Sequence, residues 1–209
     1  MSGNREVTLY YWPQSRAAAT LELLEELGAP YRLEVIDITR GEQNAPAFLA
    51  VNPMGKVPAA VMDGVVVTEQ IAIFTWLSDL FPEAGLTPAA ADPLRGPWLR
   101  WLAFYAGCFE PAMMDRALKH PPPPRVMSPY GGYDLVVETL RGQLAKGPFI
   151  LGARFTTADV LWSTALTFMT AFGLLEKTGD IAAYLARTDD RPARQRASAI
   201  NARIMAERA

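Results

Sequence analysis

The sequence predicts an α/β domain at residues 1–82, a linker at 83–97 and an all-helical domain at 98–209. Three observations support this division. Short runs of strand-forming residues alternate with helical periodicity in the first part. Prolines and glycines then become frequent between residues 82 and 97, as is typical of a linker. After the linker, apolar residues recur at helical spacing and no convincing strand follows.

The first part begins with a strand, a helix and a second strand. Residues 7–12 are rich in strand-forming residues and predict the first strand. Apolar residues with a period of 3.6 predict a helix over 17–27, and Gly28 stops it. Alternating apolar and polar residues predict a strand at 31–35, and a short helix is expected at 46–51. On the first helix, three acidic side chains are expected to face solvent: Glu22, Glu25 and Glu26.

A hairpin and a further helix complete the predicted α/β domain. The Asp-Gly pair at 63–64 lies between apolar runs at 57–62 and 65–68, and both residues of such a turn tolerate positive φ. A helix follows from residue 69, and Thr68 is its expected cap. The order strand, helix, strand, short helix, hairpin, helix therefore fills the first domain.

The second part is expected to be entirely helical. The predicted helices cover residues 98–118, 133–144, 160–172, 181–186 and 192–206. The third of these is so apolar that it should be the buried centre of the domain. Four arginines gather near the end of the chain: Arg187, Arg191, Arg194 and Arg196. Because Asp189 and Asp190 lie among them, a solvated face is expected there.

The composition argues against several classes of function. The net charge of -2 gives no general attraction to nucleic acid or to an anionic membrane. Cys108 is the single cysteine, which excludes an intramolecular disulfide and a cysteine-based zinc site, and no metal is expected. His120 is the single histidine and precedes four prolines, a stiff exposed run, so it is a poor candidate for a catalytic triad. With no signal peptide and no run of about 18 apolar residues, we expect a cytoplasmic protein.

Three places combine polar groups with the end of a helix or strand. Ser15 lies where the first strand turns into a helix, whose N-terminus carries unpaired N–H groups, so its hydroxyl either caps the helix or faces a bound anion. A cis Val57-Pro58 bond would free the backbone of Val57 for a ligand, although an ordinary turn proline is the alternative. Glu69 and Gln70 suit an α-amino-acid head group, although helix capping is again the alternative.

These places resemble motifs of the glutathione S-transferase family. The matching segments are YYWPQSRA, NPMGKVP, DGVVVTEQIAIFTWL and, far downstream, FTTADVLW. Their order and spacing match the family over essentially the whole chain. The resemblance implies a thioredoxin-like N-terminal domain that binds glutathione as co-substrate, and an all-α C-terminal domain that shapes a pocket for a hydrophobic electrophile. It also implies a homodimer and a role in detoxification.

The resemblance carries specific roles onto this sequence. Ser15 matches the serine that stabilises the glutathione thiolate. Val57 matches the backbone clamp on the cysteinyl part of glutathione, and Pro58 matches its cis proline. Glu69 and Gln70 match the pair that holds the γ-glutamyl group, although the family more often has serine at the second position. The bulkier amide of Gln70 can still hydrogen-bond a carboxylate.

Further residues are expected to support the ligand or the fold. Lys56, Arg40 or Gln43 is expected to reach the glycyl carboxylate of glutathione. Thr156 and Asp159 match a family capping box that opens the core helix of the second domain. The Thr-x-x-Asp spacing before an apolar run supports this box on physical grounds. We expect this pair to serve folding and not catalysis.

Two alternatives concern the hydroxyl and the electrophile pocket. Some family members use a tyrosine at the end of the first strand, which Tyr11 matches, and others use a serine, which Ser15 matches. The Pro-Gln-Ser-Arg turn resembles the serine type, so Ser15 is favoured. The candidate pocket residues recur about once per helical turn: Trp101, Tyr105, Phe109 and Met113. Such a stripe is also typical of plain core packing.

The predicted activity is the transfer of glutathione to a hydrophobic electrophile. A free cysteine thiol has a pKa of about 8.5, and only its thiolate attacks well. A hydroxyl that donates to the thiolate would lower the thiol pKa by roughly one to two units. Alternatives on the same fold are peroxide or disulfide reduction, dehalogenation, isomerisation, and non-catalytic binding.

Overall fold

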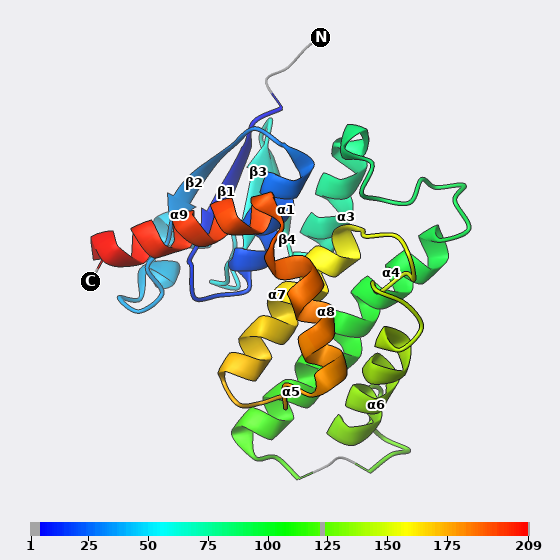
Figure 1. The fold of residues 1–209 in the computed structure, drawn as a ribbon. Coiled ribbons are helices and arrows are strands. Elements are labelled where there is room, and N and C mark those ends of the chain that lie inside the picture. The colour runs from blue at the N-terminus through cyan, green and yellow to red at the C-terminus, as the bar shows by residue number, and fades with distance from the viewer. Residues whose placement is uncertain (1–4, 122–123, 209) are drawn as a thin grey trace. The chain divides into compact units, whose positions relative to one another are not determined.

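A four-stranded mixed sheet organises the first part of the chain (Figure 1). Its strands are β1 (Val7–Tyr11), β2 (Tyr31–Val35), β3 (Ala59–Met62) and β4 (Val65–Thr68), in the order β2-β1-β3-β4. β1 runs parallel to β2 and antiparallel to β3, and β3 runs antiparallel to β4. The computed structural model describes residues 5–121 and 124–208. This sheet confirms the predicted thioredoxin-like domain.

Helices between the strands supply the rest of this core. They are α1 (Ala17–Leu27), α2 (Pro46–Leu49) and α3 (Gln70–Leu80), with short 3-10 turns at Glu42–Asn44 and Pro82–Ala84. Fully buried apolar side chains of β1, α1 and α3 pack together: Val7, Leu9, Leu21, Leu24, Ile73, Phe74 and Leu77. The helical periodicity of the sequence arises from this packing.

The hairpin turn follows the prediction, whereas the start of α3 does not. Asp63 and Gly64 adopt φ of 50° and 78°, as the tight turn between β3 and β4 requires. Thr68 ends β4 and does not cap α3, because Glu69 occupies the position before the helix and makes no capping side-chain hydrogen bond.

The last helix, α9 (Pro192–Arg208), packs against α1 (Figure 1). Two ion pairs join the two helices, Arg194–Glu22 at 3.1 Å and Arg196–Glu25 at 2.6 Å. A third, Arg191–Glu26 at 2.5 Å, joins α1 to the residue just before α9. Glu22 is buried and Arg194 largely so, with side-chain exposures of 6% and 11%. The expectation that the acids of α1 face solvent was therefore wrong, because the arginines at and near the start of α9 cover them. The solvated face expected for the arginines holds for Arg196, whose side chain is 55% exposed, and not for Arg194.

This packing also changes the division of the chain. Residues Met1–Gly85 and Arg191–Ala209 form one compact unit, and Leu86–Asp190 form the other. The last helix of the predicted helical domain, 98–209, thus belongs to the first unit. The helices of the second unit also begin earlier than predicted, because α4 starts at Arg95, inside the expected linker. We call the two units the sheet unit and the helical unit.

The helical unit is built on a long rod with a local irregularity. α4 (Arg95–Phe104) continues through a π-helical turn (Tyr105–Phe109) into α5 (Glu110–Leu118). The remaining helices are α6 (Tyr133–Leu144), α7 (Thr157–Ala171) and α8 (Gly179–Asp189). Within its described residues, this unit has no strand beyond an isolated bridge between Phe149 and Gly152. The four-proline run at 121–124 lies partly outside the described residues.

The capping box at the start of α7 is present. The N–H of Thr156 donates to the carboxylate of Asp159 at 2.9 Å, and the reciprocal contact completes the box. The same carboxylate accepts from the N–H of Ile150 at 2.7 Å and from the hydroxyl of Tyr184 at 3.0 Å. Asp159 therefore ties α7 to α8 and to the preceding loop.

None of the helices in the described ranges is long and apolar enough to cross a membrane.

Candidate functional site

The register of the sheet brings three separate segments to the same end of the sheet. Tyr10 pairs with Ala59 across β1 and β3, and Ala59 pairs with Thr68 across β3 and β4. The segment after β1, the segment before β3 and the residue after β4 therefore lie at the same end of neighbouring strands. These segments contain three of the predicted site residues: Ser15, Val57 and Glu69.

Ser15 lies at the start of α1 and is half-buried. Its hydroxyl donates to the carbonyl of Trp12 at 2.7 Å and accepts from the N–H of Ala17 at 3.1 Å. Ala17 is the first residue of α1, so the hydroxyl already serves one of the unpaired N–H groups of that helix. To donate to a bound anion, the hydroxyl proton would have to leave the Trp12 carbonyl, a small rotation at a partly accessible side chain.

Tyr11 is placed differently from Ser15. Its side chain is fully buried, and its hydroxyl has no hydrogen-bond partner among the described residues. Burial raises the pKa of Tyr11, and the neighbouring Tyr31 raises it further. A hydroxyl that is enclosed in the core and bound tightly to its proton has no access to a ligand at the surface. The geometry favours Ser15 of the two hydroxyls.

The segment before β3 presents free backbone groups. The Val57-Pro58 bond is cis, as expected, and the N–H and C=O of Val57 form no hydrogen bond with the described residues. Asn52 shapes this loop: its side chain donates to the carbonyl of Lys56 at 2.8 Å and accepts from the N–H of Met54 at 3.1 Å. A buried asparagine thus holds the loop that presents Val57.

Glu69 and Gln70 lie at the start of α3. Glu69 is exposed and adopts φ 66° and ψ 118°, a conformation that costs a residue with a Cβ about 1–3 kcal/mol. The side-chain amide of Gln70 donates to the carbonyl of Arg16 at 2.9 Å. Gln70 therefore joins the start of α3 to the start of α1, a contact that the sequence did not indicate.

A second polar loop follows β2. Asp37 is buried and accepts hydrogen bonds from Thr39 and from the N–H of Arg40, and these bonds lower the pKa of Asp37, the Thr39 hydroxyl contributing most. The side-chain oxygen of Gln43 is buried without a partner among the described residues. This loop approaches the Val57 segment, because a Cβ at Gly55 would lie 3.1 Å from the carbonyl oxygen of Gln43. Arg40 and the nearby Lys56 are exposed.

The four candidate pocket residues lie in the core of the helical unit. Trp101, Tyr105, Phe109 and Met113 are all buried. The ring of Trp162 contacts the first three, with ring centroids 5.7, 5.8 and 5.0 Å apart. In the structure these side chains therefore pack in the core of the helical unit, as the alternative interpretation expected. Cys108 is partly buried, which raises the pKa of its thiol.

Two supporting residues escaped the sequence reasoning. Asn52 and Asp37 are buried polar residues whose role is to shape the loops of the site. The Asn-Pro pair at 52–53 and the Asp-x-Thr spacing at 37–39 are turn signals that would have indicated these loops. In the described parts of the chain, no group of three or more metal-ligating side chains occurs.

Comparison with known proteins shows which family this chain resembles. A family model described as the N-terminal domain of glutathione S-transferase matches residues 5–79. Glutathione S-transferase GstA of Escherichia coli O157:H7 is 30% identical over 198 residues, covering 88% of this chain and 93% of GstA. Maleylacetoacetate isomerase maiA of Aspergillus fumigatus is 29% identical over 173 residues, covering 76% of this chain and 75% of that protein.

A solved structure extends the likeness to the whole fold. The crystal structure of a glutathione transferase from Methylococcus capsulatus str. Bath has a TM-score of 0.79 and 32% identity, covering 94% of this chain and 98% of that one. Relatives and neighbour together support a glutathione-dependent activity. The chain therefore belongs to the glutathione S-transferase family.

Proposed function

We propose that the sheet unit binds glutathione with its sulfur beside Ser15 and holds that sulfur as a thiolate for attack on a hydrophobic electrophile. The observation that carries this proposal is the contrast between two hydroxyls. Ser15 is half-buried at the start of α1, at the end of the sheet where Val57 and Glu69 also lie. The hydroxyl of Tyr11, in contrast, is enclosed in the core. Of these two hydroxyls, that of Ser15 is the one a ligand at this end of the sheet can reach.

The polar groups at this end of the sheet match the parts of glutathione. The free N–H and C=O of Val57 suit the backbone of the cysteinyl residue, since an extended peptide pairs with both groups. The carboxylate of Glu69 suits the γ-glutamyl ammonium, and the remaining N–H of the Gln70 amide suits its carboxylate.

The glycyl end would meet the loop after β2. Lys56 and Arg40 are exposed cations near the Val57 segment and the second loop, and they suit the glycyl carboxylate. The unpartnered side-chain oxygen of Gln43 suits an N–H of the ligand. This loop would therefore fix the end of the ligand farthest from the γ-glutamyl group.

The chemistry that follows is activation of the thiol. When glutathione binds, the Ser15 hydroxyl turns from the Trp12 carbonyl to the sulfur and donates to the thiolate. A hydrogen bond to a charged group contributes about 1.5–3 kcal/mol, which lowers the thiol pKa by roughly one to two units. The N-terminus of α1 adds to this effect. The thiolate then attacks the electrophile, and the leaving group departs with its bonding electrons.

Isomerisation is the second candidate reaction. The likeness to a maleylacetoacetate isomerase extends over three quarters of both chains and supports this alternative. In that case the thiolate would add to a conjugated double bond and leave again after rotation, so that glutathione is regenerated. Reduction and dehalogenation would use the same thiolate. We also infer a cytoplasmic homodimer.

The test is a pH titration of the ultraviolet absorbance of the thiolate of bound glutathione in three proteins. We expect Ser15→Ala to raise the thiol pKa by about one unit or more, and Tyr11→Phe to leave it unchanged. The reverse pattern would assign the sulfur to Tyr11. A panel of electrophiles, including a conjugated cis double bond, would then separate transfer from isomerisation.

A further inference from the structure

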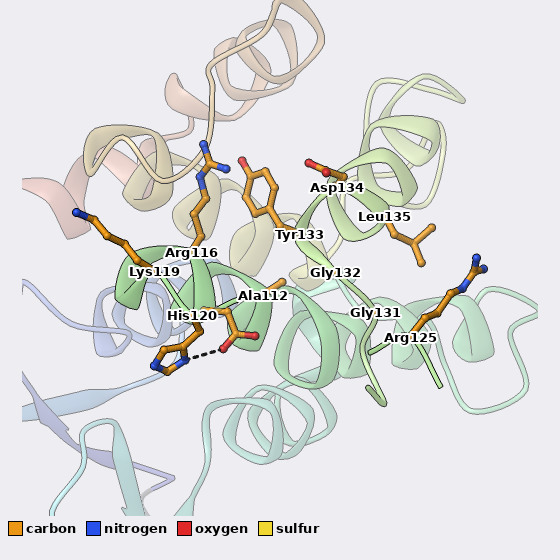
Figure 2. Close-up of a pocket in the computed structure, with 11 residues that line it drawn as sticks. Ala112, Arg116, Lys119, His120, Arg125, Gly131, Gly132, Tyr133, Asp134 and Leu135 are labelled. Atoms are coloured by element: carbon orange, nitrogen blue, oxygen red, sulfur yellow. Dashed lines mark hydrogen bonds and ion pairs between the residues drawn. The ribbon is translucent and has the colours of Figure 1, made fainter. Parts of the chain in front are cut away.

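A cavity of about 600 Å³ lies in the helical unit, between the C-terminal end of α5 and the N-terminal start of α6 (Figure 2). This volume is within the range of small-molecule sites. None of the proposed glutathione-binding residues lines it, and all of its lining residues belong to Leu86–Asp190. We call it the α5–α6 cavity.

The lining of the α5–α6 cavity has an excess of positive charge. Arg116, Lys119 and Arg125 line it, and none of them forms an ion pair with any residue that the structure describes. Two carboxylates, Asp115 and Asp134, also line it. Since three cations face two acids, the acids decide how much positive charge is left for a ligand.

The charge of Asp115 is already engaged. Its carboxylate contacts the ring nitrogen Nδ1 of His120 at 3.1 Å, the pair joined by a dashed line in Figure 2, and accepts from the hydroxyl of Tyr130. These hydrogen bonds lower the pKa of Asp115, the one from Tyr130 contributing most. Asp115 thus stays ionised and holds the chain at residue 120, while the cations beside it make no ion pair within the described part of the chain.

Arg116 is held by an aromatic ring and not by a carboxylate. Its guanidinium lies 4.2 Å from the centroid of the Tyr133 ring. Figure 2 shows the two side chains beside one another. A cation–π contact fixes the plane of the guanidinium but leaves its N–H groups free for a planar anion. Tyr133 also begins α6, whose N-cap Gly132 offers no side-chain hydrogen bond, so backbone N–H groups of α6 add to the positive end.

Apolar groups adjoin these donors. The ring of Tyr133 and the side chains of Ala112 and Leu135 line the same cavity, and Leu135 is 46% exposed. A ligand that places only an inorganic ion among the cations would leave this apolar wall in water. A ligand with an apolar body next to its charge would cover it.

We propose that the α5–α6 cavity binds a small organic anion with a planar apolar body and a single carboxylate or phosphate group. The anionic group meets the guanidinium of Arg116 and the ammonium of Lys119. The apolar body lies against Tyr133 and Leu135. The site shares no residue with the proposed glutathione site and does not depend on glutathione for its chemistry.

The test is isothermal titration calorimetry of the full chain with three probes: 2-naphthoate, 2-naphthyl phosphate and the neutral 2-naphthamide. We expect saturable binding of at least one anion and binding at least about tenfold weaker for the amide. Arg116→Gln and Lys119→Gln should each weaken the anion about tenfold, with the fold checked by circular dichroism. Arg187→Gln, which changes an exposed arginine on α8 of the same unit, should have no effect.

Three results would overturn the proposal: no saturable binding of either anion, equal binding of the amide, or equal binding by Arg116→Gln. Stronger binding of one anion over the other supports it and assigns the head group. Glutathione affinity, measured on the same samples, should not change in Arg116→Gln. Absence of glutathione binding in the wild type would refute the proposed function and leave the naphthoate result as it stands.

Discussion

Glu69 carries the clearest sign of a local constraint at the site. Its positive φ of 66° opposes the ordinary preference of a residue with a Cβ, and its exposed side chain makes no capping bond that would compensate. A glycine would adopt this conformation without strain. The presence of a carboxylate at this position is explained if the side chain binds a ligand.

Replacement of Glu69 by glycine should therefore separate stability from binding. We expect Glu69→Gly to raise the free energy of unfolding by up to about 1 kcal/mol, because the left-handed strain is relieved. It should also weaken glutathione about tenfold or more, because the bond to the γ-glutamyl ammonium is lost. Urea unfolding and calorimetry measure the two effects.

Asp63→Gly is the matched control for this change. Asp63 also has a positive φ, of 50°, but lies in the hairpin turn at the opposite end of β3 and β4. It should gain stability without losing glutathione affinity. If Glu69→Gly binds glutathione as the wild type does, Glu69 has no role in the site.

Asp159 should give the stability a recognisable pH dependence. Burial raises the pKa of Asp159 from 3.8 to about 6, although four hydrogen bonds oppose the rise. Between pH 4 and pH 6 the folded state therefore binds more protons at this residue than the unfolded state does. The free energy of unfolding should fall as pH rises through this range, by up to about 1.36 kcal/mol per pH unit from this group.

Urea unfolding between pH 4 and pH 7 in the wild type and in Asp159→Asn measures this contribution. The variant should be less stable at every pH, because an amide cannot accept all the hydrogen bonds of the carboxylate, and its stability should lack the negative slope. An equal slope in both proteins would mean that Asp159 titrates at an ordinary pKa.

At the scale of the elements, α9 belongs to the sheet unit, and its ion pairs with α1 hold it there. Glu22 and Arg194 form the most buried of these pairs. Loss of one partner of a buried pair costs about 3–5 kcal/mol, because the other charge stays buried without compensation.

We expect Arg194→Ala to lower the free energy of unfolding by about 3 kcal/mol. Arg187→Ala, at an exposed arginine on α8, should change it by less than about 0.5 kcal/mol. The double variant Glu22→Gln/Arg194→Met should recover part of the loss, since both charges of the pair are removed together. Denaturation followed by circular dichroism checks all three, and equal stability of Arg194→Ala and Arg187→Ala would contradict the assignment.

The sequence predicted the type and order of the elements because periodicity is a local signal. The hairpin at 63–64 and the box at Thr156 and Asp159 follow from turn and capping chemistry within a few residues. The partner of a helix is a tertiary property that periodicity does not contain. For this reason the charge patterns of α1 and α9 predicted two solvated faces, although in the structure charges of the two segments form ion pairs with each other.

The same limit applies to the site. The segments of Ser15, Val57 and Glu69 were found from their motifs, and the sheet register explains why they adjoin. The contact of Gln70 with Arg16 joins residues 54 positions apart, and no local pattern indicates it. The aromatic residues from Trp101 to Met113 have helical spacing whether they form a pocket or a core, and their burial around Trp162 is a tertiary property that the spacing does not contain.

At the scale of the whole molecule, exposed apolar side chains on an edge strand support the inferred homodimer. Val65 and Val66 on β4 are 56% and 45% exposed, and β4 is an edge of the sheet. An apolar edge strand left in water invites association. We expect sedimentation at about twice the 22.9 kDa mass of the chain, and a shift toward monomer in Val65→Lys. A monomeric wild type at micromolar concentration would contradict the inference.

The proton released when glutathione binds tests the central claim most directly. Calorimetry in buffers of different ionisation enthalpy counts this proton, and S-methylglutathione, which has no thiol, is the matched control. The account predicts release of roughly a quarter to three quarters of a proton at pH 7 for glutathione, no release for S-methylglutathione, and a clearly smaller release in Ser15→Ala. Binding without proton release, or no binding at millimolar glutathione, would contradict it.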